Sequence, residues 1–219
     1  LWDALRFDFG ESFYSDEPAM RLILARFPLT LVLAVSAFVF SLAVAIPVGV
    51  LSAVHRWGPV DYAGMVYSQL GMALPGFWIG ILLLLVFSVR LQWFPLFGAD
   101  TLRHFGPPAV ALGLGRSALL VRYVRGSTLD ELDREYVVTA ESMGLRRSSI
   151  RYRHVLKNAL LPVITIAGIQ FGYMLGGTII IEQVFSLPGV GRLLLSAIQQ
   201  RDFAVIQAGV VFVAVIFSS

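Results

Sequence analysis

The sequence has no cysteine and few charged residues. Of its 219 residues, 14% are charged and 57% are hydrophobic, whereas soluble domains average about 25% charged and about 45–50% apolar residues. Without cysteine, the chain forms no disulfide, no thiolate nucleophile and no zinc–thiolate site. The scarcity of charge argues against an ordinary soluble domain and predicts an integral membrane protein.

Several motifs of enzymes are also missing. There is no Gly-x-x-x-x-Gly-Lys-Ser/Thr phosphate loop, so any ATP hydrolysis must take place on another protein. There is no Gly-x-Ser-x-Gly nucleophile elbow. The histidines, His55, His104 and His154, are far apart in the sequence and do not have the spacing of metal ligands. The sequence therefore predicts a chain with no catalytic residues, no metal site and no bound cofactor.

Long apolar segments dominate the remainder. A membrane-spanning helix needs about 20 apolar residues, and lipid forces such segments into helices because it offers their backbone groups no hydrogen-bond partners. We predict five spans, at about 27–54, 62–89, 105–124, 158–182 and 203–219. The last span runs to the end of the sequence, and the first residue is not methionine. We therefore expect a fragment of a longer protein, with residues missing at both ends.

The distribution of Lys and Arg predicts the orientation. The loops at 55–61 and 122–157 carry nine of these residues, and the opposite side carries seven that are scattered. The positive-inside rule places the two loops in the cytoplasm and the N-terminus outside. The net charge of +3 is then a consequence of membrane topology and does not predict nucleic-acid binding.

The loop at 127–157 is polar but has the pattern of folded helices. Apolar residues recur at helical spacing from Leu129 to Ala140. Thr128 and Glu131 have the spacing of a capping box, which predicts a helix start, and Gly144 is placed to end that helix. A second, basic helix follows, so the sequence predicts a helix–glycine–helix projection. Binding of the basic helix to anionic lipid head groups is the alternative, although the acidic first half of the loop argues against lipid binding alone.

Five residues interrupt the apolar pattern of the spans and are candidates for a transport pathway or gate: Pro75, Arg116, Gly172, Gly176 and Glu182. The glycines lie four residues apart, and close helix packing explains that spacing as well as a pathway does. Glu182 is a functional candidate because it is ionisable and close to the membrane; the alternative is a helix-end carboxylate that either lies in the interface or pairs with Arg192 or Arg201. Three roles are open for Arg116: a cation that snorkels to the membrane interface, a cation at the contact with another subunit, or a cation that lines a pore.

The segment "LPGVGRLLLSAIQ" at 187–199 is too short to cross a membrane. It predicts a re-entrant or surface helix on the outer side, which could form part of an external gate.

The segment "YVVTAESMGLRRSSIRYRHVLKNALLPVI" at 136–164 resembles the cytoplasmic loop of permease subunits of bacterial ABC importers. The resemblance is strongest to the dipeptide/oligopeptide branch, which also includes nickel and glutathione permeases. "DFGESF" at 8–13, "RFPLTLVLA" at 26–34 and "EQVFSLPGVGRLLLSAIQQRDFAVIQA" at 182–208 are similar to other parts of that branch. The wider importer family has Glu-Ala-Ala where this chain has Val138, Thr139 and Ala140, which leaves the contacting side chains open.

The resemblance implies a fold: an all-α membrane protein, a polytopic transmembrane helix bundle of the type I ABC importer permease kind, with a cytoplasmic coupling helix. It implies one transmembrane domain over 1–219, preceded by one further helix, with the coupling loop at 127–157. The implied ATPase-coupling residues are Tyr136, Thr139, Ala140, Glu141, Met143, Gly144 and Leu145. The implied anchors of the second helix at the membrane face are Arg146, Arg147, Arg151, Arg153 and Lys157.

The resemblance also implies partners and a location. They are a second, homologous permease subunit in a heterodimer, two cytoplasmic P-loop ATPases that hold ATP and Mg, and an extracytoplasmic substrate-binding protein. The chain is expected in the bacterial inner membrane as a multi-pass protein that imports dipeptides, oligopeptides or a related solute such as a nickel chelate or glutathione.

Three other functions compete with this one. A secondary transporter or channel with a lipid-binding basic loop would need its own midplane ion or substrate site, and the predicted spans carry no Asp or Glu at mid-depth. An intramembrane enzyme would need a nucleophile and a base at mid-depth. A scaffold subunit would need the basic loop to be dispensable.

Overall fold

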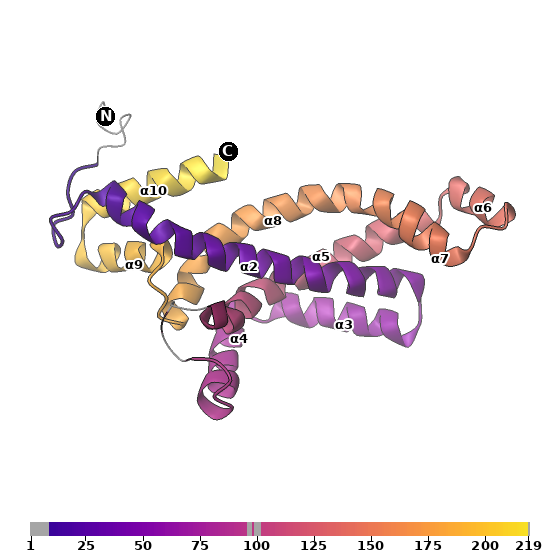
Figure 1. Ribbon diagram of the computed structural model, residues 1–219, viewed down its shortest axis with the longest axis horizontal. Helices are drawn as coiled ribbons and strands as arrows, with labels where there is room; N and C mark the ends of the chain where they lie inside the picture. Colours follow the sequence, from indigo (N-terminus) through magenta and orange to yellow (C-terminus); the bar gives the residue numbers. More distant parts are fainter. Residues whose placement is uncertain (1–8, 96–97, 99–101, 219) are drawn as a thin grey trace. The chain divides into compact units, whose positions relative to one another are not determined.

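The computed structural model describes residues 9–95, 98 and 102–218 (Figure 1). All regular structure in these ranges is helical, apart from one isolated antiparallel bridge between Glu11 and Pro18. The prediction of an all-α membrane protein is therefore confirmed. The chain divides into two compact units, each built from separate stretches of sequence. Unit 1 comprises Leu1–Ala37, Gly76–Leu112 and Gly172–Ser219, and unit 2 comprises Phe38–Pro75 and Gly113–Phe171.

The helices in chain order are α2 (Ala19–Val54), α3 (Pro59–Ala73), α4 (Gly76–Leu83), the π-helical η1 (Leu84–Arg90), the 3-10 turn η2 (Leu102–Phe105), α5 (Gly106–Leu132), α6 (Glu135–Ser142), α7 (Arg147–Ser149), the π-helical η3 (Ile150–Val155), α8 (Leu156–Val184), α9 (Val190–Gln200) and α10 (Phe203–Ser218). Ala19–Val54 and the run Arg147–Val184 are each long and apolar enough to cross a membrane. The apolar part of α10, Phe203–Ile216, is shorter than these two helices.

The segment predicted as one span over 62–89 is two helices, α3 and α4, with a break between them. Leu74 ends α3 in an extended conformation, with φ −84° and ψ 128°. Pro75 accounts for the break, because proline has no backbone N–H and disfavours a helical conformation at the residue before it.

The helix predicted to start at Thr128 does not start there. α5 continues through this position to Leu132, and the Thr128 hydroxyl donates to the Val124 carbonyl within the helix at 2.6 Å. Thr128 is buried, so its side chain packs inside unit 2, and this packing outweighs the local capping signal. The second helix of the loop starts at Arg147 and continues without interruption into α8.

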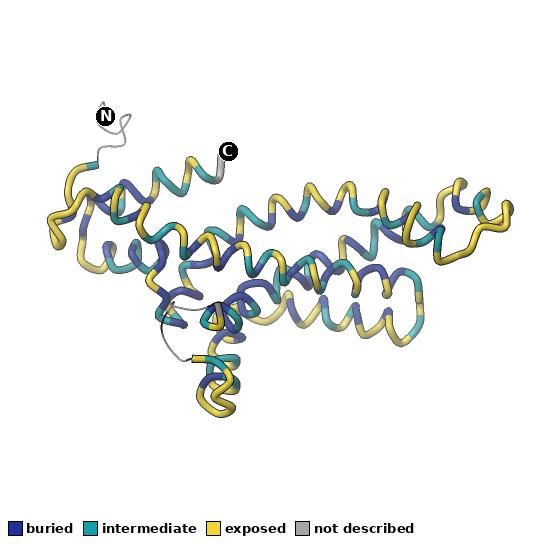
Figure 2. Tube along the Cα trace, viewed as in Figure 1, coloured by how far each residue is buried: buried dark blue, intermediate teal, exposed yellow. Residues whose placement is uncertain are grey.

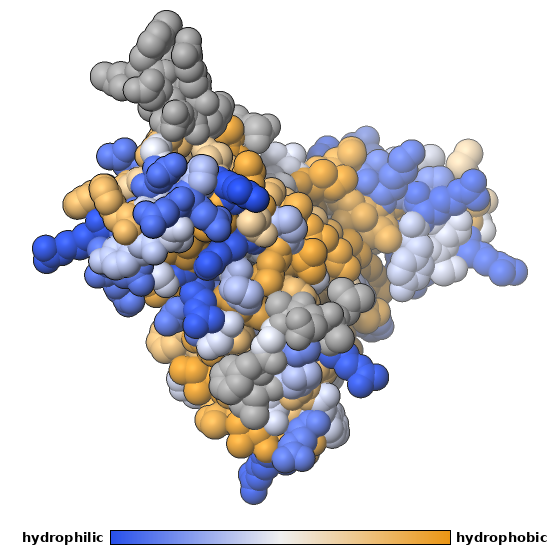
Figure 3. Space-filling model, turned by 60° about the vertical axis from the view of Figure 1, so that its left-hand side comes forward, coloured by the Kyte–Doolittle hydropathy of each residue, from blue (hydrophilic) through white to orange (hydrophobic). Residues whose placement is uncertain are grey.

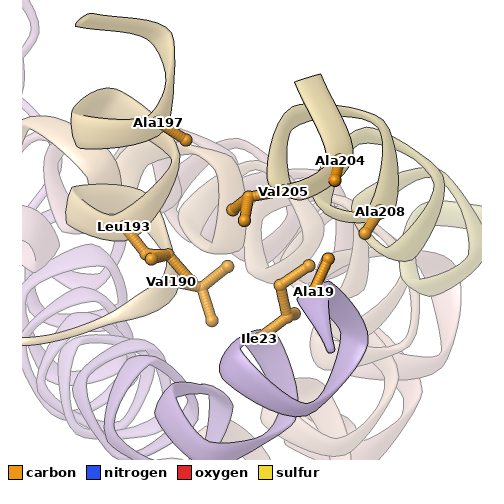
Figure 4. Packing of buried hydrophobic residues seen from close by; sticks show 8 residues of the cluster. All are labelled: Ala19, Ile23, Val190, Leu193, Ala197, Ala204, Val205 and Ala208. Carbon is orange, nitrogen blue, oxygen red and sulfur yellow. The ribbon is translucent and has the colours of Figure 1, made fainter. Parts of the chain in front are cut away.

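The core of unit 1 lies where α9, α10 and the start of α2 meet (Figure 4). Its buried side chains are Ala19, Ile23, Val190, Leu193, Ala197, Ala204, Val205 and Ala208. Phe27 and Phe212 pack edge to face beside this cluster, with ring centroids 5.0 Å apart. Small residues on all three helices let their backbones approach closely, which is how helices pack in a membrane.

Long apolar side chains remain exposed along α2 and α8 (Figure 2). Val39, Leu161 and Ile164 are between 59% and 65% exposed. On the face drawn in Figure 3, hydrophobic side chains gather in the middle, and hydrophilic ones gather at the left, at the right and at the bottom of the view. Soluble monomers rarely expose so much contiguous apolar surface, and lipid is the environment that covers it.

Gly49 lies where α2 and α5 pack closely in unit 2. A Cβ added at Gly49 would lie 2.6 Å from Val124 Cβ and 2.9 Å from the Val121 carbonyl oxygen, whereas one added at Gly126 would meet nothing within 4 Å. We expect Gly49→Ala to lower the free energy of unfolding by about 1–3 kcal/mol through overpacking. Gly126→Ala is the matched control and should raise it slightly, by at most about 1 kcal/mol, because alanine is the better helix former. Unfolding of each variant in mixed micelles measures both effects, and equal effects would contradict the close approach.

Candidate functional site

α6 is a short helix held against the polar loop by one apolar side. Val137 packs with Ile150 and Val155, and all three are buried. Leu132 at the end of α5 and Ala140 of α6 complete this cluster. The loop is thus a folded unit, as the sequence predicted, and its fold depends on contacts between α6 and the start of the following helix.

Tyr136 adds a polar contact to the same side of α6. Its hydroxyl donates to Glu131 at 2.8 Å, and Arg134 lies 3.7 Å from the same carboxylate. Partial burial raises the pKa of the Tyr136 hydroxyl above its ordinary value, and the hydrogen bond to Glu131 raises it further. The phenol therefore keeps its proton at physiological pH and remains a donor, which ties α6 to the end of α5.

Exposed apolar side chains lie on α6 and directly after it. Met143 is 78% exposed, Val138 63% and Leu145 46%. Thr139 and Glu141 are also exposed; the Thr139 hydroxyl bonds within the helix and Glu141 lies 3.4 Å from Arg147. An apolar patch bordered by polar residues on a projecting helix is typical of a protein–protein contact.

Gly144 turns the chain after α6 with a φ of +77°, and a Cβ there would meet no atom within 4 Å. The requirement for glycine is therefore conformational and not steric. We expect Gly144→Val to destabilise α6 by about 1–2 kcal/mol, since a β-branched residue resists positive φ. Gly144→Asn should cost clearly less, because asparagine tolerates this region. Amide hydrogen exchange in α6 measures the difference, and equal protection in the two variants would contradict a conformational requirement.

The predicted anchor residues are placed differently along the second helix. Arg146, Arg147, Arg153 and Lys157 are exposed, and Arg151 is half-buried. Arg153, His154, Lys157 and Asn158 line one open pocket at the start of α8. The exposed apolar residues Leu161 and Ile164 follow directly along α8, so the change from cationic to apolar surface occurs within about two turns.

The five pathway candidates are divided between the two units. Pro75 and Arg116 belong to unit 2, and Gly172, Gly176 and Glu182 belong to unit 1. Arg116 donates from Nη1 to Gln170 Oε1 at 3.0 Å. Gly172 and Gly176 are half-buried in α8, and Gly176 lines an apolar cavity together with Phe27, Thr30 and Ile179.

Glu182 is fully buried. Its carboxylate accepts a hydrogen bond from the Thr30 hydroxyl at 2.7 Å and one from the Arg192 backbone N–H at 2.9 Å. The Arg192 side chain instead donates to the Ser186 carbonyl at 2.6 Å. The carboxylate of Glu182 thus bonds to a hydroxyl and a backbone N–H inside unit 1, while the charged group of Arg192 bonds to a backbone carbonyl.

Sequence reasoning missed a buried ion pair in unit 2. Asp61 accepts from Arg125 Nε at 2.5 Å and from Arg125 Nη2 at 2.8 Å, and it also accepts the Trp57 backbone N–H at 3.0 Å. The Asp61 side chain is 0% exposed and that of Arg125 20%. This bidentate pair joins the start of α3 to α5. The only signal in the sequence was an isolated acidic residue at the start of an apolar helix.

The sequence also matches a known family. The family described as "Binding-protein-dependent transport system inner membrane component" matches residues 45–219, which is more than half of the chain. The chain belongs to this family. It is thus a membrane-spanning permease subunit of an ATP-driven importer in the inner membrane, and the predicted family is confirmed. Membership implies ATPase and binding-protein partners in general, and the family consists of transport subunits.

Individual relatives agree with this assignment of the permease. It is 40% identical over 217 residues to the glutathione transport system permease protein GsiC of Pectobacterium atrosepticum, covering 99% of this chain and 71% of the relative. It is 39% identical over 227 residues to the oligopeptide transport system permease protein AppB of Bacillus subtilis, covering 99% and 72%.

Solved structures show that the permease shares its fold with ABC importers. An inward-facing structure of the MetNI methionine ABC transporter matches with a TM-score of 0.71 at 18% identity, covering 91% of each chain. A structure of an amino acid ABC transporter with histidines matches with a TM-score of 0.60 at 19% identity, covering 90% of this chain and 86% of the other. These matches confirm the type I importer permease fold.

Proposed function

We propose that this permease carries short peptides, or a related solute such as glutathione or a nickel chelate, across the inner membrane. The observation that carries the proposal is its 40% and 39% identity, over nearly the whole chain, to permeases named for glutathione and oligopeptide transport. The broken helix α3–α4 at Pro75 and the glycines Gly172 and Gly176 of α8 are our candidates for the parts of the pathway that adapt to a solute.

α6 is the proposed contact for an ATPase subunit. Val138 of α6 and the following residues Met143 and Leu145 are exposed and apolar, while Val137 packs against the rest of the loop. A helix that is braced on one side and apolar on the other fits a groove on a partner protein. Gly144 ends the helix, and Tyr136, Thr139, Ala140 and Glu141 complete the proposed coupling segment.

The basic residues after Gly144 are the proposed anchors of the second helix at the cytoplasmic face. They are Arg146, Arg147, Arg151, Arg153 and Lys157. Anionic lipid head groups attract such residues, and the apolar surface of α8 begins directly after them.

The proposed assembly contains this permease, a second homologous permease in a heterodimer, two cytoplasmic ATPases and an external binding protein. ATP and Mg are held by the ATPases, so the permease itself catalyses no reaction and binds no cofactor. The absence of a phosphate-loop motif from the sequence supports this division.

Uptake into proteoliposomes tests the proposal. The full-length permease, reconstituted with its ATPases, second permease and binding protein, should accumulate a labelled dipeptide, glutathione or nickel chelate only when ATP is present on the ATPase side. A catalytically inactive ATPase is the control and should abolish uptake. Uptake that follows an ion gradient in the absence of ATP would overturn the proposal in favour of a secondary transporter.

A further inference from the structure

The first turn of α9 has no capping side chain from its own segment. Gly189 occupies the position before the helix and has no side chain to accept a hydrogen bond. The backbone N–H groups at the start of a helix need external acceptors. Here, two other helices supply them. Thr30 of α2 accepts from the Val190 N–H at 2.9 Å, and Glu182 of α8 accepts from the Arg192 N–H at 2.9 Å.

The two capping side chains are also bonded to each other. The Thr30 hydroxyl donates to Glu182 Oε1 at 2.7 Å, so each donor in the set meets one acceptor. Glu182 is 0% and Thr30 4% exposed. A carboxylate accepts only, so it suits two incoming donors, and its negative charge is favoured at a helix N-terminus. The two capping side chains are therefore shielded from solvent.

The glycines around the start of α9 allow this close contact. A Cβ added at Gly191 would lie 2.6 Å from Ile179 Cα and 3.0 Å from Glu182 Oε2, and one added at Gly189 would collide with the Glu182 carboxyl group. The sequence Gly189-Val190-Gly191 thus lets the backbone of α9 reach the carboxylate. The pattern that predicted a short helix also sets how closely that helix packs against α8.

We propose that Glu182 and Thr30 are positioning residues that fix α9 to α2 and to the end of α8, so that α9 moves with those helices. Glu182 then neither lines a pathway nor couples an ion, because its carboxylate oxygens are used by Thr30 and by the backbone of α9. The role of α9 in an external gate that responds to the binding protein rests on the proposed function. The attachment of α9 to α2 and α8 does not depend on the proposed function.

A spin label on α9 tests the attachment directly. Ile198 is 57% exposed on α9, so Ile198→Cys in a cysteine-free version of the full-length complex accepts a nitroxide without disturbing the core. Thr30→Val keeps the size of the side chain but removes the hydroxyl, which leaves the Val190 N–H and a Glu182 oxygen unpaired. We expect a more mobile label in Thr30→Val and a wild-type spectrum in Thr30→Ser, which keeps the hydroxyl. An unchanged spectrum in Thr30→Val would overturn the proposal.

A second variant covers the case in which Thr30→Val gives no folded complex. Glu182→Gln keeps the shape of the side chain but turns an amide NH2 toward one of the two donors. Raised mobility of the label in Glu182→Gln then supports the attachment, and an unchanged spectrum overturns it. Gly168→Ala, at a position on α8 where an added Cβ meets nothing within 4 Å, is the control and should leave the label unchanged.

ATP hydrolysis by the reconstituted complex tests the role of α9 in an external gate. In Thr30→Val, ATP hydrolysis stimulated by the binding protein should fall roughly fivefold, because loss of a helix cap shifts the equilibrium between attached and detached α9 by about that factor. Basal ATP hydrolysis should stay at the wild-type level. An equal fall in both, or no fall, would overturn the gate role of α9. The spin-label result is independent of whether the complex transports peptides, so failure of the proposed function and failure of the attachment can be told apart.

Discussion

Asp61→Asn should lower the free energy of unfolding of the permease by about 2–3 kcal/mol. The substitution removes the charge that balances Arg125 and leaves the guanidinium in a largely shielded site. Breaking a fully buried pair costs about 3–5 kcal/mol. We expect less here because Arg125 keeps 20% of its side chain exposed. Reversible unfolding of the full-length protein in mixed micelles measures the change.

Two further variants isolate the effect of the pair. Arg125→Gln combined with Asp61→Asn replaces two charges by two neutral hydrogen-bonding groups and should recover most of the lost stability. Asp133→Asn breaks a second ion pair, in which Asp133 and Arg56 are 74% and 48% exposed and 3.9 Å apart, and should cost less than about 1 kcal/mol. If Asp61→Asn costs no more than Asp133→Asn, the pair between α3 and α5 does not stabilise the fold.

Met143→Asp should weaken binding of the ATPase about 30-fold or more. Met143 is 78% exposed, so the substitution leaves the fold of the loop intact and acts only on a partner. A charge placed in an apolar contact loses the buried area and is itself desolvated, and the few hot-spot residues of an interface each contribute at least about 2 kcal/mol. Co-purification and titration of the ATPase against the reconstituted permease measure the loss. Val138→Asp should have the same effect.

Matched variants separate the contact from general changes in charge. Met143→Leu keeps the apolar surface and should bind normally. Ser148→Asp adds the same charge at an exposed position of the loop outside α6 and should change affinity by much less. Wild-type affinity in Met143→Asp would show that α6 is not the docking surface, and the basic residues at the start of α8 would become the next candidate.

The coupling loop shows how far the sequence predicted the proposed site. Gly144 adopts the left-handed turn that its position suggested, and α6 precedes it. The start of α6 was misplaced, because Thr128 is buried within α5 and bonds to its own helix. The sequence also could not separate Val137 from Val138. The first is buried and the second exposed, and this depends on which side of α6 meets Ile150 and Val155.

The sequence by itself determined the class of the protein, the approximate positions of its helices and the family, because these follow from local properties: apolar length, the chemistry of glycine, and continuous motifs. Only the tertiary structure decided the roles of Asp61 and Glu182. Asp61 meets a residue 64 positions away, and Glu182 meets one 152 positions away. A buried carboxylate is stabilised by whichever donors the fold brings to it, and no local pattern specifies donors so distant in the sequence.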